Sequence, residues 1–381
     1  MKELAVKIKG FLAYDLMLLE KRFYWKTKKY LSKYYNNLEA LPIQRNKTLI
    51  YMLDGRAYSG GISDIIKGII SMYKFSKEIG FDFRINFCFP YKLHEYLESN
   101  WYDWKIPENE LSYNSSFSAP FWIYNAHLSY GKKSEFEIAF QRKILQKFIK
   151  NNALKQQFHI YTNSEWAQGY EYSVLFHELF KPAKPLQDVL NYHNNIIGTE
   201  YYSMTFRFQQ LLGDFVENEL EFDKTAYILE QLKQSGEFVD KTSPHKEFQL
   251  RAILGDYKNK NISVPLNEIG KKILINRCIE KIVEIHTTKF SYKKILVTAD
   301  SETFLSKVNE LDFVYAISGK GISKNATENE IYDIFLKPYI DILLLSEAKQ
   351  IQLLYTKSMY KSGFAKNASF INNREYLEIK F

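Results

Sequence analysis

One β-α-β pattern near the start of the chain constrains its fold more than any other feature. An apolar run of strand length, TLIYML (48–53), leads into the glycine-containing turn DGRAYSGG (54–61). Residues 62–80 then place isoleucines at helical spacing and end on Gly80, a residue that favours helix C-termini. The next segment, FDFRINFCF (81–89), alternates as a strand does. This order predicts an α/β fold built on a parallel sheet.

Strands and helices keep alternating along the rest of the chain. KPAKP (181–185) is rigid and breaks helices, so we expect an interdomain hinge or loop there. Pro338 is expected to kink the last long helix or to divide it in two. The pattern predicts strands at 158–163, 200–208, 293–300, 313–317 and 351–356, and helices at 223–235, 266–289, 301–311, 327–349 and 362–371.

These elements predict two Rossmann-like domains that face a central cleft. The chain has 381 residues, which suits two domains of ordinary size. We place the first domain at 46–185 and the second at 186–381, after a basic helical segment at 1–45. Residues 237–263 are polar and irregular, and we expect them to pass over the cleft.

The N-terminal segment combines helical spacing with many lysines and the aromatic residues Phe23, Tyr24 and Trp25. Two interpretations stay open. A basic helix with aromatic side chains can lie on an anionic membrane surface, here through residues 1–35. The same pattern also fits an ordinary solvated helix packed on the body of the protein.

The composition of the chain indicates which kinds of ligand and which cellular compartment to expect. The formal net charge is +8, which suits an anionic partner such as a nucleotide or a phospholipid. The lysines are spread along the chain instead of forming one stripe, so we do not expect nucleic-acid binding. Cys88 and Cys278 are far apart, which favours a reducing, cytoplasmic compartment over a disulfide scaffold. We predict no transmembrane helix and no signal peptide.

Two segments carry candidate anion-binding groups. Gly60 and Gly61 lie between a strand and a helix, where backbone N–H groups can approach an anion; a tight turn is the plainer alternative. Arg207, in TFRFQQLLGDF (205–215), lies at the end of a predicted strand, where α/β sheets bind ligands. Its planar guanidinium suits a diphosphate, although a structural Arg–Asp salt bridge would also explain it.

Three further positions suit a nucleotide. Asp300 ends a strand, and it would either accept hydrogen bonds from a base or ribose or cap the next helix. Asp341 lies in an apolar run and needs polar partners, which purine N–H groups or an internal hydrogen bond would supply. Ser362 and Gly363 begin a helix and form either a phosphate-binding turn or a simple N-cap.

Motifs for metal and nucleophile chemistry are missing from the sequence. There is no Asp-x-Asp, no H-E-x-x-H and no G-x-S-x-G. We therefore expect neither a metal site nor a serine nucleophile.

Five fragments, in this order, resemble motifs of the GT-B fucosyltransferase superfamily, which includes the nodulation-type α1,6-, core α1,6- and protein O-fucosyltransferases. YSGGISDIIKGIISMYKFSKE resembles the N-terminal glycine-rich turn and helix, and LFKPAKPL the entry into the second domain. TFRFQQLLGDF is similar to the H-x-R-x-G-D region, and ILVTADSETFL to the strand–Asp segment. YIDILLLSEAK with YKSGFAKNAS resembles the C-terminal donor-binding motif.

The resemblance implies a role for each matching residue. Arg207 would contact the donor pyrophosphate and support the loss of GDP, and Asp341 would recognise guanine. Asp300 would lie on the nucleotide side. The phosphate-binding turn would be Ser362, Gly363 and Phe364, and the glycine loop with the polar residue beside the sugar or acceptor would be Gly60, Gly61 and Asp64.

The sequence also departs from the family pattern. Thr205 stands where the family has a histidine, a second consecutive arginine is missing, and Gln209–Leu212 lengthen the loop before Gly213. These departures leave the donor sugar open. GDP-L-fucose is the default, and GDP-mannose, a GDP-heptose or a non-catalytic nucleotide- or glycan-binding protein are the alternatives.

The implied activity is an inverting, metal-independent hexosyl transfer without a cofactor, from a GDP-sugar to a glycan hydroxyl. Asp64 is the first candidate for the general base and Asp54 the second, with a substrate-assisted route as a further alternative. The Lys-, Asn- and Ile-rich composition suggests an AT-rich bacterial genome. We therefore expect a surface-polysaccharide or lipid-linked oligosaccharide acceptor, handled at the inner face of the plasma membrane.

Overall fold

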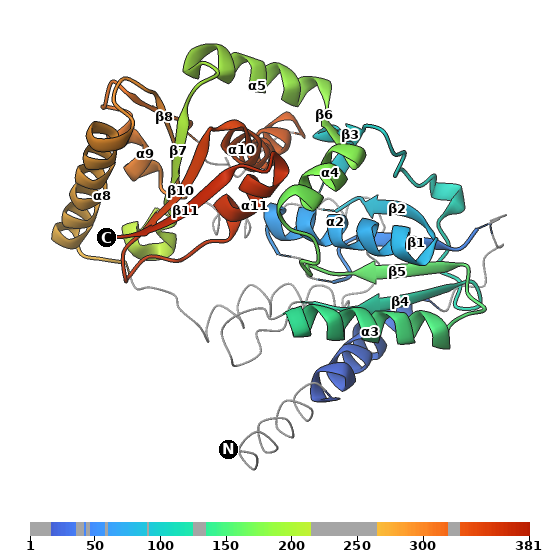
Figure 1. The fold of residues 1–381 in the computed structure, drawn as a ribbon. Coiled ribbons are helices and arrows are strands. Elements are labelled where there is room, and N and C mark those ends of the chain that lie inside the picture. Colours follow the sequence, from blue (N-terminus) through green and yellow to red (C-terminus); the bar gives the residue numbers. More distant parts are fainter. Residues whose placement is uncertain are drawn as a thin grey trace. The chain divides into compact units, whose positions relative to one another are not determined.

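The computed structural model describes residues 17–35, 42, 46–57, 60–89, 91–124, 135–214, 265–318 and 328–381. The predicted helix at 223–235 and the polar stretch 237–263 lie outside these ranges. The chain divides into two compact units, which are described separately (Figure 1). The first comprises Met1–Leu93, Ser99–Gln168 and Glu178–Phe180, and the second His94–Glu98, Gly169–His177 and Lys181–Phe381.

The first unit is built on a four-stranded parallel sheet in the order β2-β1-β5-β4. Every residue of β1 is buried, because β1 is an inner strand of the sheet. Helices α2 and α3 lie side by side on one face of the sheet, where Arg142 of α3 forms an ion pair with Glu78 of α2. The elements are β1 (Thr48–Leu53), α2 (Ile62–Ile79), β2 (Asp82–Phe87), β4 (Ser118–Trp122), α3 (Glu135–Asn151) and β5 (Gln157–Tyr161).

Helix α2 forms as its sequence predicts. The buried stripe includes Ile65, Ile66, Ile69 and Ile70, and Gly80 ends the helix in the left-handed conformation, with φ of 70°. Before β1, residues 17–26 are helical and continue through a π turn (Thr27–Leu31) and a 3₁₀ turn (Ser32–Tyr34).

The second unit is built on a five-stranded parallel sheet in the order β11-β10-β7-β8-β9. One apolar cluster of β7, α8, β8 and α9 side chains forms part of its core. The elements are α5 (Lys184–Ile197), β7 (Tyr202–Thr205), α8 (Glu268–Lys289), β8 (Ile295–Thr298), α9 (Glu302–Val308), β9 (Val314–Ala316), α10 (Glu328–Glu347), β10 (Gln350–Tyr355), α11 (Phe364–Ile371) and β11 (Glu375–Lys380).

The remaining elements are short. Helix α4 spans Gly169–Leu179, and β3 (Leu97–Ser99) pairs with β6 (Phe180–Pro182) in a two-stranded sheet. Single 3₁₀ turns occupy Leu93–Glu95, Glu108–Glu110 and Gln209–Leu212.

The predicted α/β class with parallel sheets is confirmed, and two local predictions are corrected. The segment 181–185 is not a loop: it ends β6 and begins α5, whose first turn accepts Pro185 because the N–H groups there have no helical partner. Pro338 does not divide the long helix, since α10 runs through it as one element.

Among the described residues no helix is long and apolar enough to cross a membrane.

Candidate functional site

Arg207 lies just beyond the C-terminal end of β7, the central strand of the second unit. From β7 the chain adds β8 and β9 on one side and then returns to place β10 and β11 on the other. The strand order therefore reverses between β7 and β10. Ligands of open α/β sheets bind in the crevice at such a reversal, outside the carboxyl ends of the strands. Arg207 is at that position.

Asp300, at the end of β8, fixes the arginine and its turn. Its carboxylate accepts hydrogen bonds from the backbone N–H groups of Phe208 (2.7 Å) and Gln209 (2.8 Å). The same carboxylate lies 3.3 Å from Arg207 Nε, and its side chain is only 3% exposed against 25% for Arg207. Asp300 therefore lies beneath Arg207. Part of the arginine side chain stays open to solvent.

The helix-cap alternative for Asp300 is wrong. Ser301, not Asp300, caps α9 by accepting a hydrogen bond from the Phe304 N–H group. Asp214 completes that cap, accepting from Ser301 Oγ at 2.9 Å and the Thr303 N–H group at 2.8 Å. The Arg–Asp salt bridge considered as an alternative for Arg207 is present, with Asp300 as its partner.

Two residues before the Ser362 turn, the chain contacts Arg207 directly. After β10 the backbone N–H of Tyr360 donates a hydrogen bond of 3.1 Å to the carbonyl oxygen of Arg207. Two residues later Ser362 Oγ accepts from the Phe364 N–H group at 3.2 Å, and Gly363 caps α11. The cationic side chain and the start of α11 thus follow β7 and β10, the two strands that adjoin the reversal.

Asp341 lies on α10 and Thr205 on β7, both in the second unit. Asp341 is 8% exposed on α10 and forms an ion pair of 2.5 Å with Lys337 Nζ, one helical turn earlier. The internal partner considered from sequence is therefore present. Thr205 Oγ1 and Thr298 Oγ1 share a buried hydrogen bond of 3.0 Å across β7 and β8. This position, a histidine in the family pattern, carries no titratable group here.

In the first unit the glycine turn brings Gly60 against Asp64. Gly60 has φ of +86°, and a Cβ atom added there would lie 2.5 Å from Asp64 Oδ2. Gly61 begins α2 and accepts hydrogen bonds from the Asp64 and Ile65 N–H groups. Asp64 pairs with Lys67 and keeps 37% of its side chain exposed. A glycine at position 60 is what allows the carboxylate to sit over the turn.

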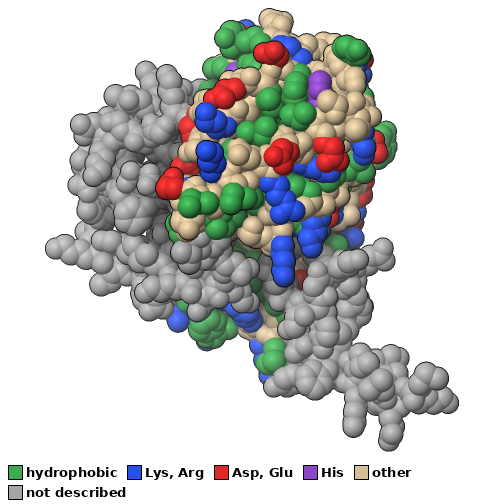
Figure 2. All heavy atoms as spheres, turned by 90° about the vertical axis from the view of Figure 1, so that its left-hand side faces the viewer, with side chains coloured by type: hydrophobic (Ala, Val, Ile, Leu, Met, Phe, Trp, Pro, Cys, Tyr) green, Lys and Arg blue, Asp and Glu red, His purple; other side chains and the backbone are tan. Residues whose placement is uncertain are grey.

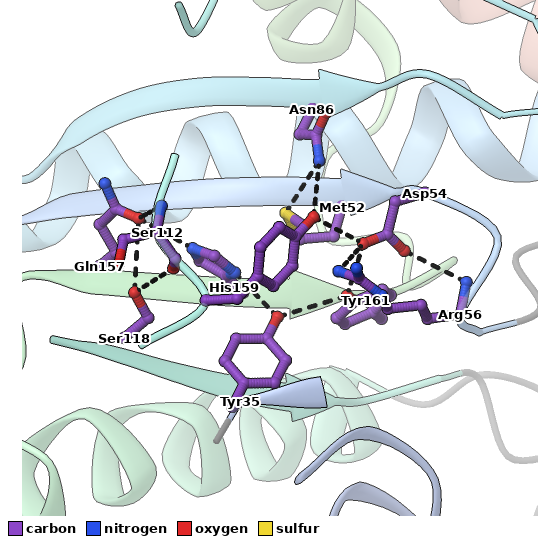
Figure 3. Close-up of polar contacts among 11 residues, drawn as sticks. Tyr35, Met52, Asp54, Arg56, Asn86, Ser112, Ser118, Gln157, His159 and Tyr161 are labelled. Atoms are coloured by element: carbon purple, nitrogen blue, oxygen red, sulfur yellow. Dashed lines mark hydrogen bonds and ion pairs between the residues drawn. The ribbon is translucent and has the colours of Figure 1, made fainter. Parts of the chain in front are cut away.

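A second polar cluster follows β1 in this unit and was not predicted as a whole (Figure 3). Asp54 Oδ2 accepts hydrogen bonds from Tyr113 OH and Tyr161 OH, each at 3.0 Å, and from Arg56 Nη1 at 2.8 Å. Its Oδ1 accepts from the Arg56 N–H group. With its oxygens so occupied and its side chain 5% exposed, Asp54 suits the fixing of Arg56 better than proton abstraction.

The cluster continues inward to a buried histidine. Tyr35 OH lies 2.8 Å from His159 Nδ1, and His159 Nε2 lies 3.1 Å from Gln157 Oε1. Burial, with the Arg56 charge, lowers the pKa of His159 to about 3. Burial and the Asp54 charge raise the pKa values of Tyr35 and Tyr113 well above their ordinary range. These groups are neutral at physiological pH, so they serve as fixed hydrogen-bonding partners.

Arg56 is the exposed end of the cluster. Its guanidinium lies 3.9 Å from the ring centroid of Tyr113 and 5.0 Å from that of Tyr34, and 24% of its side chain is exposed. The sequence signal for it was the polar turn after a buried strand. Its carboxylate partner Asp54 lies in the same turn, but Tyr34 and Tyr113 come from two distant segments that no local spacing could have revealed.

Comparison with known proteins identifies similar folds only. No protein-family model matches the sequence, and no curated protein matches it. The fold is similar to NodZ α1,6-fucosyltransferase soaked with GDP-fucose, with 11% identity over 86% of this chain and 93% of that chain, at a TM-score of 0.42. A FUT1 mutant from Arabidopsis thaliana in complex with GDP gives 8% identity over 92% and 74%, at 0.48. POFUT1 in complex with GDP-fucose gives 10% identity over 90% and 99%, at 0.41. Likeness at this level assigns no residue and no activity to this chain.

Proposed function

We propose that this protein is an inverting, metal-independent glycosyltransferase of the GT-B type that uses a GDP-sugar, by default GDP-L-fucose. The observation that carries the proposal is Arg207, which Asp300 fixes at the strand reversal of the second unit beside the loop that leads to Ser362. The sequence resemblance supports the donor class, and this geometry supports a diphosphate at this position.

In the proposed reaction an acceptor hydroxyl oxygen attacks the anomeric carbon of the donor sugar. The bond from that carbon to the β-phosphate oxygen breaks, and GDP leaves with the electron pair. Arg207 stabilises the negative charge that develops on the β-phosphate, together with N–H donors at the Ser362–Gly363–Phe364 turn. A permanently charged guanidinium suits this step because its charge does not depend on pH.

Asp300 acts through Arg207 in this proposal. Its buried carboxylate holds the guanidinium and the turn that carries it, on the nucleotide side of the proposed site. Asp341 is proposed to accept hydrogen bonds from guanine, with Lys337 balancing its charge. Asp64, the more exposed of the two candidate bases, is proposed to take the acceptor proton. Gly60 and Gly61 shape the turn that holds it.

Substitution of Arg207 tests the assignment. Arg207→Ala and Arg207→Lys are both expected to lower turnover of the GDP-sugar by about 10²–10³, since one preorganised cation at the leaving group is lost or misplaced. Folding should survive, which circular dichroism and thermal unfolding would check. Near-wild-type turnover by Arg207→Ala would reject the proposal.

A competition assay among GDP-L-fucose, GDP-mannose and a GDP-heptose would identify the donor. The acceptor is proposed to be a glycan hydroxyl of a bacterial surface polysaccharide or a lipid-linked oligosaccharide, in the cytoplasm. Mass spectrometry of the product would identify it. GDP binding without transfer across an acceptor panel would favour a non-catalytic binding protein instead.

A further inference from the structure

The helical segment 17–35 is firmly attached to the first unit along one side. Leu19, Phe23, Thr27 and Leu31 are each buried and recur every four residues. Thr27 Oγ1 accepts a hydrogen bond of 2.9 Å from the Trp122 N–H group of β4, and Phe23 packs edge-on against Tyr124. The segment is therefore a fixed part of the fold, and its orientation on the unit is set.

The opposite side of the segment carries large apolar side chains in the open. Met17 is 44% exposed, Leu18 43% and Trp25 53%. Lys29 Nζ lies 4.8 Å from the Trp25 ring centroid, so a cation sits beside the exposed indole. An indole with adjacent lysines is the combination that stabilises proteins at the headgroup level of a bilayer.

The charge of this side has one sign. The described residues 17–35 include six basic residues against one acid, Glu20. Two of the six lie over aromatic rings of the unit itself, Lys26 over Trp122 and Tyr124 and Arg22 over Tyr124. The exposed lysines that remain are Lys21, Lys28, Lys29 and Lys33. Glu20 turns to α3, where it forms an ion pair of 2.8 Å with Lys147. The side of the second unit that carries α8 differs, because acidic and basic side chains are interspersed on it (Figure 2). Lys271 pairs there with Glu268, and Lys281 with Glu284.

We infer that this side of segment 17–35 binds an anionic phospholipid surface, with Met17, Leu18 and Trp25 entering the interface and the lysines contacting headgroups. Cations alone would suit any polyanion. The exposed apolar side chains favour a lipid surface over a nucleic acid, because they gain only where there is an apolar layer to enter. The inference does not depend on the proposed transferase activity.

Co-sedimentation of the full chain with vesicles tests it. We expect binding to vesicles of phosphatidylglycerol and phosphatidylethanolamine, and little binding to pure phosphatidylcholine. Each lysine near an anionic surface contributes a factor of about five in binding. The double variant Lys21→Gln with Lys28→Gln should therefore bind about 25-fold more weakly. The matched control, Lys271→Gln with Lys281→Gln, removes the same charge from α8 and should bind like the wild type.

Fluorescence quenching by brominated lipids tests the depth of insertion. Trp25 should be quenched in the wild type, and Trp25→Phe should keep the binding while losing that part of the quenching. Equal binding by both double-lysine variants would overturn the inference. So would binding to the soluble polyanion heparin as strong as to vesicles, with no quenching. Calorimetric GDP binding by the same variants should be unchanged, which separates this result from the fate of the transferase proposal.

Discussion

Replacing Asp300 by asparagine tests how the site is held together. The carboxylate accepts from the Phe208 and Gln209 N–H groups and lies 3.3 Å from Arg207 Nε, at 3% exposure. Asparagine keeps one acceptor oxygen but turns an NH₂ group toward a donor. A hydrogen bond to a charged group contributes about 1.5–3 kcal/mol, and the orphaned N–H adds to the loss. We expect the free energy of unfolding to fall by about 2–3 kcal/mol.

Asp300→Asn should also lower turnover, and by more than the loss of folded protein would explain. Arg207 would lose its fixed position, and a displacement of about 1 Å near a reacting bond can cost about 10²-fold. GDP release from GDP-L-fucose at saturating donor, at a temperature where the variant stays folded, measures this effect. Urea unfolding measures the stability term separately.

Asp214→Asn is the matched control for Asp300→Asn. Asp214 also accepts two hydrogen bonds at the end of the same sheet, but it serves the cap of α9. Its loss should cost about 1 kcal/mol of stability and leave turnover unchanged. If Asp300→Asn and Asp214→Asn reduced turnover equally, or if neither did, the positioning role of Asp300 would be refuted.

Three further predictions concern other parts of the molecule. Between pH 7 and pH 5 the free energy of unfolding should fall by about 2 kcal/mol through His159, because the unfolded side chain binds a proton below its ordinary pKa of 6.5 and the buried one does so only near 3. Urea titrations at both pH values should show that this fall in the free energy of unfolding is lost in His159→Gln. The same fall in the variant as in the wild type would contradict the prediction. Gly60→Ala should destabilise the fold by about 1–2 kcal/mol in thermal unfolding, since alanine is strained at φ of +86° and its Cβ would meet Asp64. The control Gly61→Ala should not destabilise the fold, because its Cβ has open space. Equal effects of the two variants would reject the steric argument. Asp341→Asn should weaken GDP binding about tenfold in calorimetry while pyrophosphate binding stays the same, and an unchanged GDP affinity would assign Asp341 to its ion pair with Lys337 alone.

Local patterns predicted the elements whose signals are complete in the sequence. The run TLIYML coincides with β1, and the isoleucine spacing with Gly80 defines α2. Strand β4 escaped prediction because Pro120 lies in its middle. Proline is tolerated there since β4 is an edge strand of its sheet, and edge position depends on contacts that the sequence alone does not reveal.

The parts of the site that the sequence did not predict depend on contacts between residues far apart in the chain. The strand end predicted the position of Arg207, but the partner that holds it, Asp300, lies 93 residues further along the chain and meets it only because β7 pairs with β8. The cluster around Asp54 joins Tyr35, Tyr113 and Tyr161 from distant segments in the same way. Buried hydrogen-bonded networks leave no periodic trace, so the sequence predicted the turn after β1 and not its purpose.

The central claim is that Arg207 supplies the cation for loss of GDP from a GDP-sugar, and one measurement tests it most directly. GDP release from GDP-L-fucose, with a glycan acceptor panel and EDTA present, should proceed in the wild type and fall by about 10²–10³ in Arg207→Ala. Turnover by Arg207→Ala close to that of the wild type would contradict the claim, as would GDP binding by the wild type without any release from the donor.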